Sequence, residues 1–343
     1  MRWTFVVPGG LLPAAIVPDI LRDPRASPLA ELLARADSGV LEPIGPTEGS
    51  PDLDWLWREF GGTSATPVTA PYAYRALRRD GDLPPNLWFA TPVHFAFARD
   101  HLLVEQIDDL EPAERAALAA VADDCARSSG ARLVGEAAGR TWFMSFDRPW
   151  SLEAIPLPAA LGLSVADALP RGADEARWRK LLTEIQIEWH AHPVNAAREE
   201  RGQRRANGLW LHGGGDWQPL PRAAFGAVAG AAPILRGWAL AAGVPDSQLH
   251  EGEALPASTA TTVTWIKSLA APARLQNWDA WLGRVAQLAT QFAELKPRAF
   301  TAGFDIELVL GGERSVRRVT LERAGRWKFW KRTPVARLLS EAA

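Results

Sequence analysis

The chain has 343 residues, of which 47% are hydrophobic, enough for one large α/β domain and a smaller second one. The formal net charge of −2 gives no overall attraction to nucleic acid or anionic lipid. Cys125 is the single cysteine, which excludes an internal disulfide and most thiolate metal sites. No signal peptide is evident, nor a run of about 20 apolar residues, so we expect a cytoplasmic protein that makes no membrane contact.

The first half of the sequence predicts one buried strand and then a compact mixed unit. Residues 2–7 are continuously apolar and end at Pro8-Gly9-Gly10, a helix is expected over 28–36, and 64–71 is expected to be an exposed loop. From residue 86 the pattern changes to short strands around one amphipathic helix. The strands are expected at 93–97, 101–104, 132–134 and 141–146, and the helix at 111–129.

The second half opens with a proline-rich linker over 149–170. Helices are expected over 173–192, within 223–242 and over 277–295, a buried strand over 209–211, and a hairpin from 304–310 and 315–323. Strands that alternate with helices predict an α/β fold with a mainly parallel sheet flanked by helices. Residues 1–85 and 149–343 would form this domain, and 86–148 a small inserted α+β domain.

One segment carries a specific motif. It reads Leu-Pro-Arg-Gly at 169–172, His-Pro-Val-Asn at 192–195, Arg198 and Gly202, and then Ala-Asn-Gly-Leu-Trp-Leu-His-Gly-Gly-Gly at 206–215. This pattern resembles the archaeal-type cofactor-independent phosphoglycerate mutases of the alkaline phosphatase superfamily. It is similar, more closely still, to a proteobacterial subgroup described as RpfE-type regulatory proteins. The resemblance covers most of the chain and implies an alkaline phosphatase-like domain interrupted by an inserted one.

The metal ligands that the resemblance implies are missing. Active members use two divalent cations to activate a hydroxyl and neutralise the phosphoryl oxygens. Gly9 stands where the first Asp should be, residues 268–277 hold neither His nor acid, and no His follows His250. We therefore expect no bound metal, no other cofactor and no catalysis. The expected protein is a degenerate phosphoglycerate mutase-like one with a regulatory or ligand-binding role; the alternative is an active mutase or phosphatase whose ligands are unrecognised.

An anionic or phosphorylated small molecule is the expected ligand. The candidate binding residues are Asn195, Arg198, Asn207, His212, Gly213, Gly214 and Gly215. A guanidinium grips a phosphate with paired hydrogen bonds, and N–H groups in a Gly-rich turn attract anions. Under the family plan these residues converge after strand 209–211, because ligands gather at the carboxyl ends of an open sheet. Under the alternative, Arg198 pairs with a neighbouring acid and the asparagines satisfy loop backbone.

Other chemistry-bearing residues are weaker candidates. Ser50 falls near the family's nucleophile but has no metal or base beside it, and Asp100-His101 lies inside the insert. His190 and His192 are two positions apart, which places them on different helix faces. Cys125 lies on an apolar helix face and is expected in the core.

A basic segment lies near the C-terminus. Residues 314–332 hold eight Arg and Lys against the single acid Glu322, interleaved with Trp327, Phe329 and Trp330. We favour an edge hairpin kept from aggregating by its charges. As a binding surface, Arg314–Arg332 suits an acidic protein partner better than nucleic acid.

Overall fold

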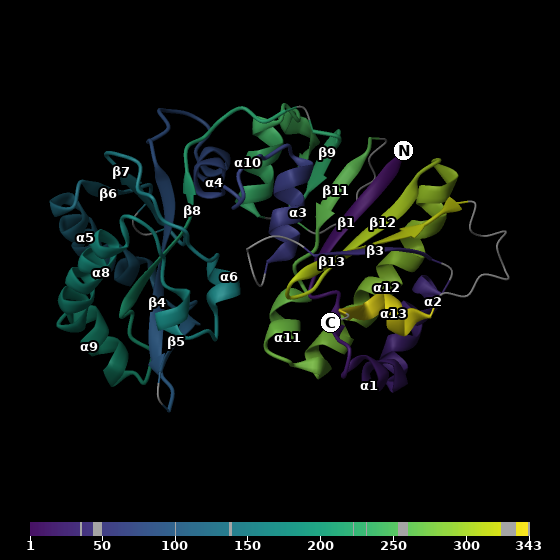
Figure 1. The fold of residues 1–343 in the computed structure, drawn as a ribbon, viewed down its shortest axis with the longest axis horizontal. Helices are drawn as coiled ribbons and strands as arrows, with labels where there is room; N and C mark the ends of the chain where they lie inside the picture. The colour runs from purple at the N-terminus through teal and green to yellow at the C-terminus, as the bar shows by residue number, and fades with distance from the viewer. Residues whose placement is uncertain are drawn as a thin grey trace. The chain divides into compact units, whose positions relative to one another are not determined.

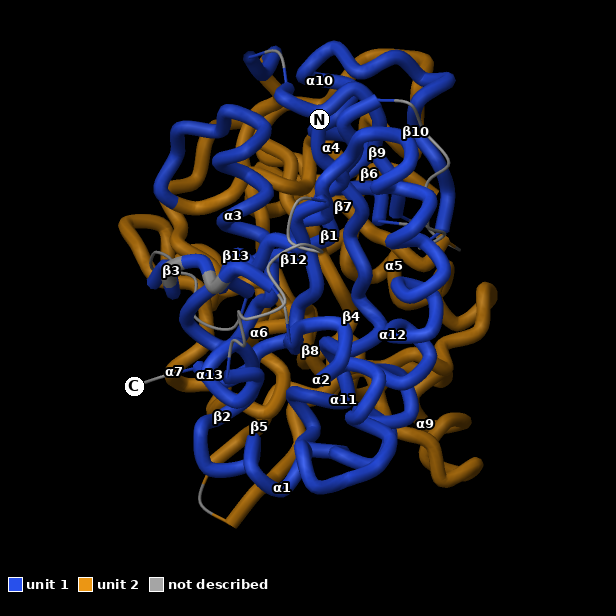
Figure 2. Tube along the Cα trace, turned by 90° about the vertical axis from the view of Figure 1, so that its right-hand side faces the viewer, with its two compact units in different colours: residues 1–65, 219–343 blue, residues 66–218 orange. Residues whose placement is uncertain are grey.

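The computed structural model describes residues 1–34, 36–43, 50–99, 101–136, 139–221, 223–230, 232–252, 260–323 and 334–341. The chain divides into two compact units, coloured separately in Figure 2. Unit 1 comprises residues 1–65 and 219–343, and unit 2 residues 66–218. Each unit has its own hydrophobic core. Among the described residues, no helix is both long enough and apolar enough to span a membrane.

A seven-stranded sheet forms the centre of unit 1 (Figure 1). Its order is β10-β9-β11-β1-β12-β13-β3; the pairings from β10 to β12 are parallel, and β13 is antiparallel to both neighbours. The strands are β1 (Arg2–Pro8), β3 (Asp37–Pro43), β9 (Ala227–Ala229), β10 (Leu249–His250), β11 (Thr262–Trp265), β12 (Asp305–Gly311) and β13 (Ser315–Leu321). This mostly parallel sheet confirms the predicted α/β fold class.

Helices cover both faces of this sheet, because side chains alternate along each strand. Trp3, Phe5 and Val7 of β1 enter the core beneath the long helix α12, where Phe5 meets Phe292 edge-on at 4.9 Å between ring centroids. Helices α3 and α10 contribute Trp57 and Trp238 to the other side, 5.4 Å apart. The helices of unit 1 are α1 (Val17–Arg22), α2 (Ser27–Leu33), α3 (Pro51–Glu59), α10 (Pro233–Ala241), α11 (Ala270–Arg274), α12 (Trp278–Thr301) and α13 (Val335–Leu339), with 3₁₀ turns η1 (Pro24–Ala26) and η2 (Asp246–Gln248).

Unit 2 is built on an antiparallel sheet around β4 (Leu87–Phe97). Strand β8 (Gly208–Gly215) pairs with β4, as do β5 (Leu102–Gln106) and β7 (Phe143–Phe146), and β6 (Ala131–Val134) extends the sheet from β7. The helices of unit 2 are α4 (Ala70–Leu77), α5 (Pro112–Ser128), α6 (Leu157–Ala160), α7 (Val165–Ala168), α8 (Glu175–His190) and α9 (Pro193–Glu200).

The boundaries of the two units differ from the predicted domains of 1–85 with 149–343 and of 86–148. Residues 149–218 belong with the α+β part because β8 pairs with β4 from Val93↔Gly208 to Leu87↔Gly215. The expected linker over 149–170 is also not a linker. It contributes Trp150, Leu157 and Val165 to the core of unit 2 and forms two short helices, of which α6 has a proline in its first turn.

Proline explains several other differences. Pro193 ends α8, as predicted, but it also occupies the first turn of α9, where its missing N–H costs nothing. Pro51 and Pro71 likewise lie in the first turns of α3 and α4, and α4 overlaps the loop expected over 64–71. Helix α12 continues past Leu295 to Thr301, through Pro297. The predicted helix over 111–129 and the hairpin of β12 and β13 are confirmed.

Candidate functional site

Arg198, the predicted anion ligand, is completely buried in unit 2 and fully engaged there. Its Nη1 donates to the Glu114 carboxylate at 2.8 Å, its Nη2 to Asp109 Oδ1 at 2.5 Å, and its Nε to the Arg204 carbonyl at 2.7 Å. Burial raises the pKa of Glu114, but the Glu111 N–H and Arg198 more than compensate, so that pKa lies below its ordinary value. Arg198 therefore anchors α9 to the capped start of α5, and its guanidinium has little left to offer a ligand.

The side chains of Asn195 and Asn207 form hydrogen bonds with backbone N–H and carbonyl groups. Asn195 donates to the carbonyls of Trp189 and Ala206, both at 2.7 Å, and its own oxygen accepts from the Ala206 N–H at 2.9 Å. Asn207 bridges to β4, where its oxygen accepts from the Phe95 N–H at 2.6 Å and its amide donates to the Phe95 carbonyl at 3.1 Å. Both side chains hold the chain in register as it enters β8.

His212 and the three glycines lie at the other end of β8. The imidazole stacks on Phe89 at 4.9 Å, and burial lowers the pKa of His212 to about 3, so the ring is neutral at physiological pH. A Cβ at Gly214 would overlap the Trp88 ring, and one at Gly213 would overlap the Thr69 hydroxyl. These glycines are strand residues required by close packing, and not the anion-binding turn that the sequence predicted.

The seven candidate residues therefore do not converge. Asn207 bonds to Phe95 of β4, whereas His212 pairs with Phe89, six residues away and about 20 Å along a strand. The prediction also placed this strand in the parallel sheet, but β8 is antiparallel to β4 in the other unit. The alternative interpretation, in which Arg198 pairs with acids and the asparagines satisfy backbone, agrees with the structure.

The other residues of unit 2 that were considered as functional candidates are described by their contacts in the fold. His192 caps α9 by accepting from the Val194 N–H at 3.2 Å, and His190 lies 3.4 Å from Arg205. Cys125 packs against the core, and burial raises the pKa of its thiol. His101 is exposed at the start of β5, while Asp100 lies outside the described residues.

The basic segment is not an edge hairpin, because β13 lies between β12 and β3. Arg317 is buried, and Arg318 donates twice to Glu307, at 2.8 and 3.0 Å. These two arginines are therefore engaged inside unit 1. Residues 324–332 of the segment lie outside the described residues.

A different group of polar residues gathers at the carboxyl edge of the parallel sheet in unit 1. Gly9 follows β1 with φ +75°, and a Cβ added there would lie 2.5 Å from the Leu269 carbonyl oxygen and 2.9 Å from the Ala273 side chain. The Gly9 carbonyl also accepts from Trp281 Nε1 at 2.8 Å. The place implied for a first metal-binding Asp is thus filled by the start of α11.

Asp52 is the buried acid of this edge. It lies in the first turn of α3, two residues after Ser50, and accepts from Trp265 Nε1 at 2.9 Å. A Cβ at Gly311 would lie 3.5 Å from the Asp52 Cβ, which places Asp52 at the end of β12. Burial raises the pKa of Asp52, and the Trp265 bond and the charges of Lys267 and Arg274 oppose that rise only in part. A buried carboxyl with a raised pKa at a sheet edge is typical of functional sites.

Two cations accompany Asp52. Lys267 follows β11, and its Nζ lies 4.9 Å from the centre of the Trp265 ring. Arg274 ends α11; burial lowers its pKa, and the carboxylates of Asp52 and Glu313 oppose this effect. Among the described residues, no group of three or more His, Cys, Asp or Glu side chains is placed to hold a metal ion. The edge therefore offers positive side chains and one buried acid.

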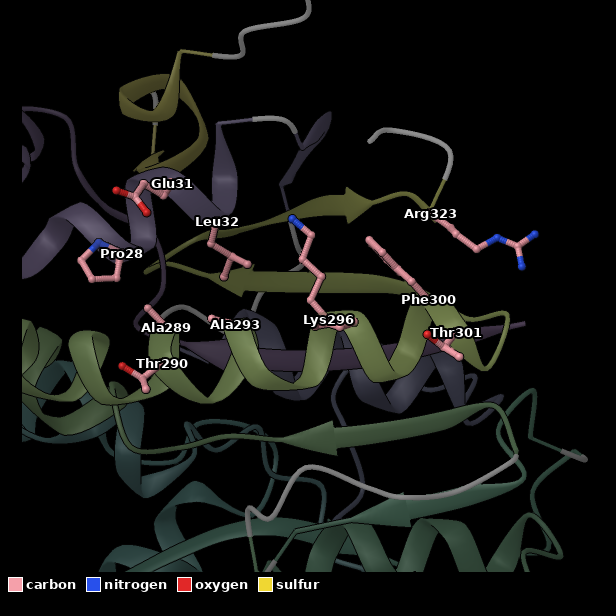
Figure 3. Close-up of a pocket in the computed structure, with 11 residues that line it drawn as sticks. Pro28, Glu31, Leu32, Ala289, Thr290, Ala293, Lys296, Phe300, Thr301 and Arg323 are labelled. Atoms are coloured by element: carbon pink, nitrogen blue, oxygen red, sulfur yellow. The ribbon is translucent and has the colours of Figure 1, made fainter. Parts of the chain in front are cut away.

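A groove of about 1000 Å³ lies elsewhere on unit 1, between α2 and α12 (Figure 3). Leu32, Ala289 and Phe300 contribute apolar surface, Lys296 lies near the middle of the groove and Arg323 at one end. The predicted ligand-binding residues line neither this groove nor the carboxyl edge. The buried Asp52 with its raised pKa makes the carboxyl edge the better candidate site.

Comparison with known proteins agrees with this architecture. No family model matches the chain. A 2,3-bisphosphoglycerate-independent phosphoglycerate mutase from Methanosarcina mazei is 31% identical over 104 residues, which are 29% of this chain and 26% of that protein. The chain thus matches only about a quarter of the length of this curated relative.

Two solved structures are similar to the whole chain. The PH0037 protein from Pyrococcus horikoshii has a TM-score of 0.56 at 14% identity, over 93% of this chain and 87% of its own. The cofactor-independent phosphoglycerate mutase from Thermoplasma acidophilum has a TM-score of 0.44 at 14% identity, over 100% and 96%. The likeness to a phosphoglycerate mutase in sequence is confined to the 104 residues matched in the Methanosarcina protein. At 14% identity, the match to the Pyrococcus protein shows a common fold and no more.

The sequence did not single out Asp52, Lys267 or Arg274. In the sequence, residues 268–277 are distinguished only by the lack of His and acid. No motif marks Lys267, directly before this stretch, or Arg274 within it. Gly9 was recognised as unusual, but only the fold shows that the space beside it is closed. The missed signal was the strand-end position of Lys267, directly after an apolar run.

We expect Arg198→Ala to destabilise unit 2 by about 3 kcal/mol, because it removes a fully buried guanidinium together with its hydrogen bonds to Glu114, Asp109 and the Arg204 carbonyl. Urea unfolding followed by tryptophan fluorescence measures the change. Arg201→Ala is the matched control, since Arg201 bonds to the same Glu114 at 2.5 Å but is half exposed and should cost under about 1 kcal/mol. Equal losses in the two variants would contradict the role of Arg198 as anchor.

We expect Asp52→Asn to stabilise unit 1 near pH 8 and to lose that advantage near pH 4. A carboxyl whose pKa is raised by folding costs stability as the pH rises from its unfolded to its folded pKa, and an amide has no such cost. Thermal unfolding across this pH range reports the difference, at about 2–4 °C per kcal/mol for a unit of this size. Asp246→Asn, on an exposed turn, should leave the pH profile unchanged. A pH profile of Asp52→Asn that parallels the wild type would refute the assignment.

Proposed function

We propose that this protein is a cytoplasmic, non-catalytic relative of the phosphoglycerate mutases. It has a regulatory role and binds an anionic, phosphorylated ligand at the carboxyl edge of its parallel sheet. The observation that carries the proposal is the filled space beside Gly9, where the Leu269 carbonyl and Ala273 leave no room for a carboxylate side chain.

The absence of catalysis follows from the ligand chemistry of divalent cations. Mg²⁺ and Mn²⁺ need several converging oxygen or imidazole donors. The resemblance places the first such donor at Gly9, whose φ of +75° alone would strain an aspartate. Asp52 is a single buried carboxyl bonded to Trp265, with cations rather than further acids around it. Ser50, at the start of α3, would then lack the metal that turns a serine hydroxyl into a nucleophile.

The proposed binding of an anion follows from the positively charged side chains at the carboxyl edge. Lys267 and Arg274 bring positive groups to the edge where active family members hold metal ions. An ammonium and a guanidinium both bind phosphate, the guanidinium with paired hydrogen bonds. The raised pKa of Asp52 works in the same direction, since it lowers the fraction of this carboxyl that carries a negative charge at a given pH. Arg198, Asn195 and Asn207 are not assigned to this site, because they belong to unit 2.

The first test is activity. We expect no turnover of 3-phosphoglycerate or of a generic phosphomonoester when Mn²⁺ or Zn²⁺ is added, because one carboxyl cannot assemble two cations around a phosphoryl group. A coupled enolase assay and a chromogenic phosphatase assay measure the two reactions. Turnover that rises with metal and vanishes with chelator would establish the alternative, an active mutase or phosphatase with unrecognised ligands.

The second test is binding. A hydrogen bond to a charged group contributes about 1.5–3 kcal/mol, so Lys267→Ala and Arg274→Ala should each weaken 3-phosphoglycerate binding about ten- to a hundredfold. Isothermal titration calorimetry measures the affinities. Lys296→Ala and Arg284→Ala remove the same charges from α12 and should bind like the wild type. If the wild type binds no phosphorylated three-carbon acid, or if all four variants bind equally, the anion site lies elsewhere or does not exist.

A further inference from the structure

The chain near its C-terminus is held at the β12–β13 turn by one carboxylate. Glu341 accepts hydrogen bonds from the backbone N–H groups of Glu313 and Arg314, both at 2.8 Å, and from the Ser315 hydroxyl at 2.6 Å. Three consecutive residues thus direct their donors at one anion. Successive N–H groups arranged in this way form a concave site that binds phosphates and carboxylates.

The turn has the shape as well as the donors for an anion. A Cβ at Gly312 would overlap the Glu341 carboxylate, so only a glycine leaves the space open. Gly312 donates its own N–H to the Ser315 carbonyl at 2.9 Å, which closes the turn. The hollow is therefore built by the hairpin itself, and Glu341 enters it from a segment 26 residues further along the chain.

A buried arginine extends the same surface. Arg317 lies two residues after Ser315 on β13, on the same face of the strand, and only 6% of it is exposed. Its Nη2 donates to the Ser340 carbonyl at 3.2 Å and its Nη1 to the Gly39 carbonyl at 3.5 Å. Its Nε has no hydrogen-bond partner among the described residues. A buried guanidinium with a spare donor is a strong site for an oxyanion.

The segment that covers these donors is the short strand β14 (Ser340–Glu341). It pairs with β2 (Leu12–Pro13), which begins two residues after Gly10. The β12–β13 turn itself follows the carboxyl end of β12, and Glu313 in it is near enough to Arg274 to affect that residue's pKa. Strand β14 thus lies across the carboxyl edge of the sheet.

We propose that Glu313, Arg314, Ser315 and Arg317 form an oxyanion-binding site that β14 occupies through the Glu341 carboxylate. A phosphate or carboxylate ligand and β14 then exclude each other, so binding of the ligand releases the strand from the sheet edge. The Glu341 side chain marks the position of the ligand's charged oxygens. This site is separate from Lys267 and Arg274, and it stands whether or not those residues bind a ligand.

Glu341→Ala tests the competition, with inorganic phosphate as the probe. The variant should bind phosphate at least tenfold more tightly than the wild type by calorimetry, and phosphate should restore much of the melting temperature that the substitution removes. The gain should persist with Lys267→Ala and Arg274→Ala added, which separates this site from the one proposed above. Glu294→Ala, an exposed glutamate of α12, is the matched control and should show no gain.

A second measurement uses the wild-type protein and does not depend on a variant that folds. Amide hydrogen exchange of the peptide covering 335–341 should accelerate in phosphate relative to chloride at equal ionic strength, while the exchange of α12 stays constant. The proposal is overturned if phosphate leaves this exchange unchanged. It is equally overturned if Glu341→Ala lowers the melting temperature but binds phosphate no better than the wild type, since Glu341 would then only pin the chain to its hairpin.

Discussion

The close approach of α11 to the end of β1 is the constraint on which the carboxyl edge of unit 1 depends. The Leu269 carbonyl and Ala273 lie so near Gly9 that no side chain fits there, and the positive φ of Gly9 lets the chain turn away at once. The same approach sets the positions of Trp281, which donates to the Gly9 carbonyl, and of Arg274 at the end of α11. The glycine at position 9 thus allows α11 to pack against the end of β1, which brings Arg274 to the carboxyl edge of the sheet.

In unit 2 the motif over residues 192–215 contributes hydrogen bonds and close packing contacts within the fold. Asn195, Arg198 and Asn207 bond to backbone or to the acids around the start of α5, and the glycines of β8 let Trp88 and Thr69 approach the strand. The bonds of Asn207 to Phe95 and of Arg198 to Glu114 join segments more than 80 positions apart in the sequence. Such residues keep a fold recognisable without taking part in chemistry, which is why fold resemblance alone does not transfer an activity.

The sequence predicted the fold class well because its strongest signals are local. The buried strand at 2–7, the hairpin around Gly311-Gly312 and the helix over 111–129 depend on periodicity and turn residues within a few positions. The compact units differ from the predicted domains because the pairing of β8 with β4 joins residues more than a hundred positions apart. The predicted binding residues do not converge for a related reason. Arg198 has the chemistry of an anion ligand, and only the fold shows that Glu114 and Asp109 already surround it.

The proposed function puts side-chain cations where the phosphoglycerate mutases hold metal ions, and the two kinds of cation differ in their chemistry. A divalent ion both neutralises a phosphate and lowers the pKa of a hydroxyl that it coordinates, so it binds the substrate and activates the nucleophile together. An ammonium or guanidinium supplies a single charge and hydrogen bonds, without an orbital to accept the oxygen of Ser50. Lys267 and Arg274 therefore suit the first task and not the second. Under the proposed function, an edge built in this way would keep affinity for a phosphorylated ligand, whereas the step that transforms the ligand would need the metal ions.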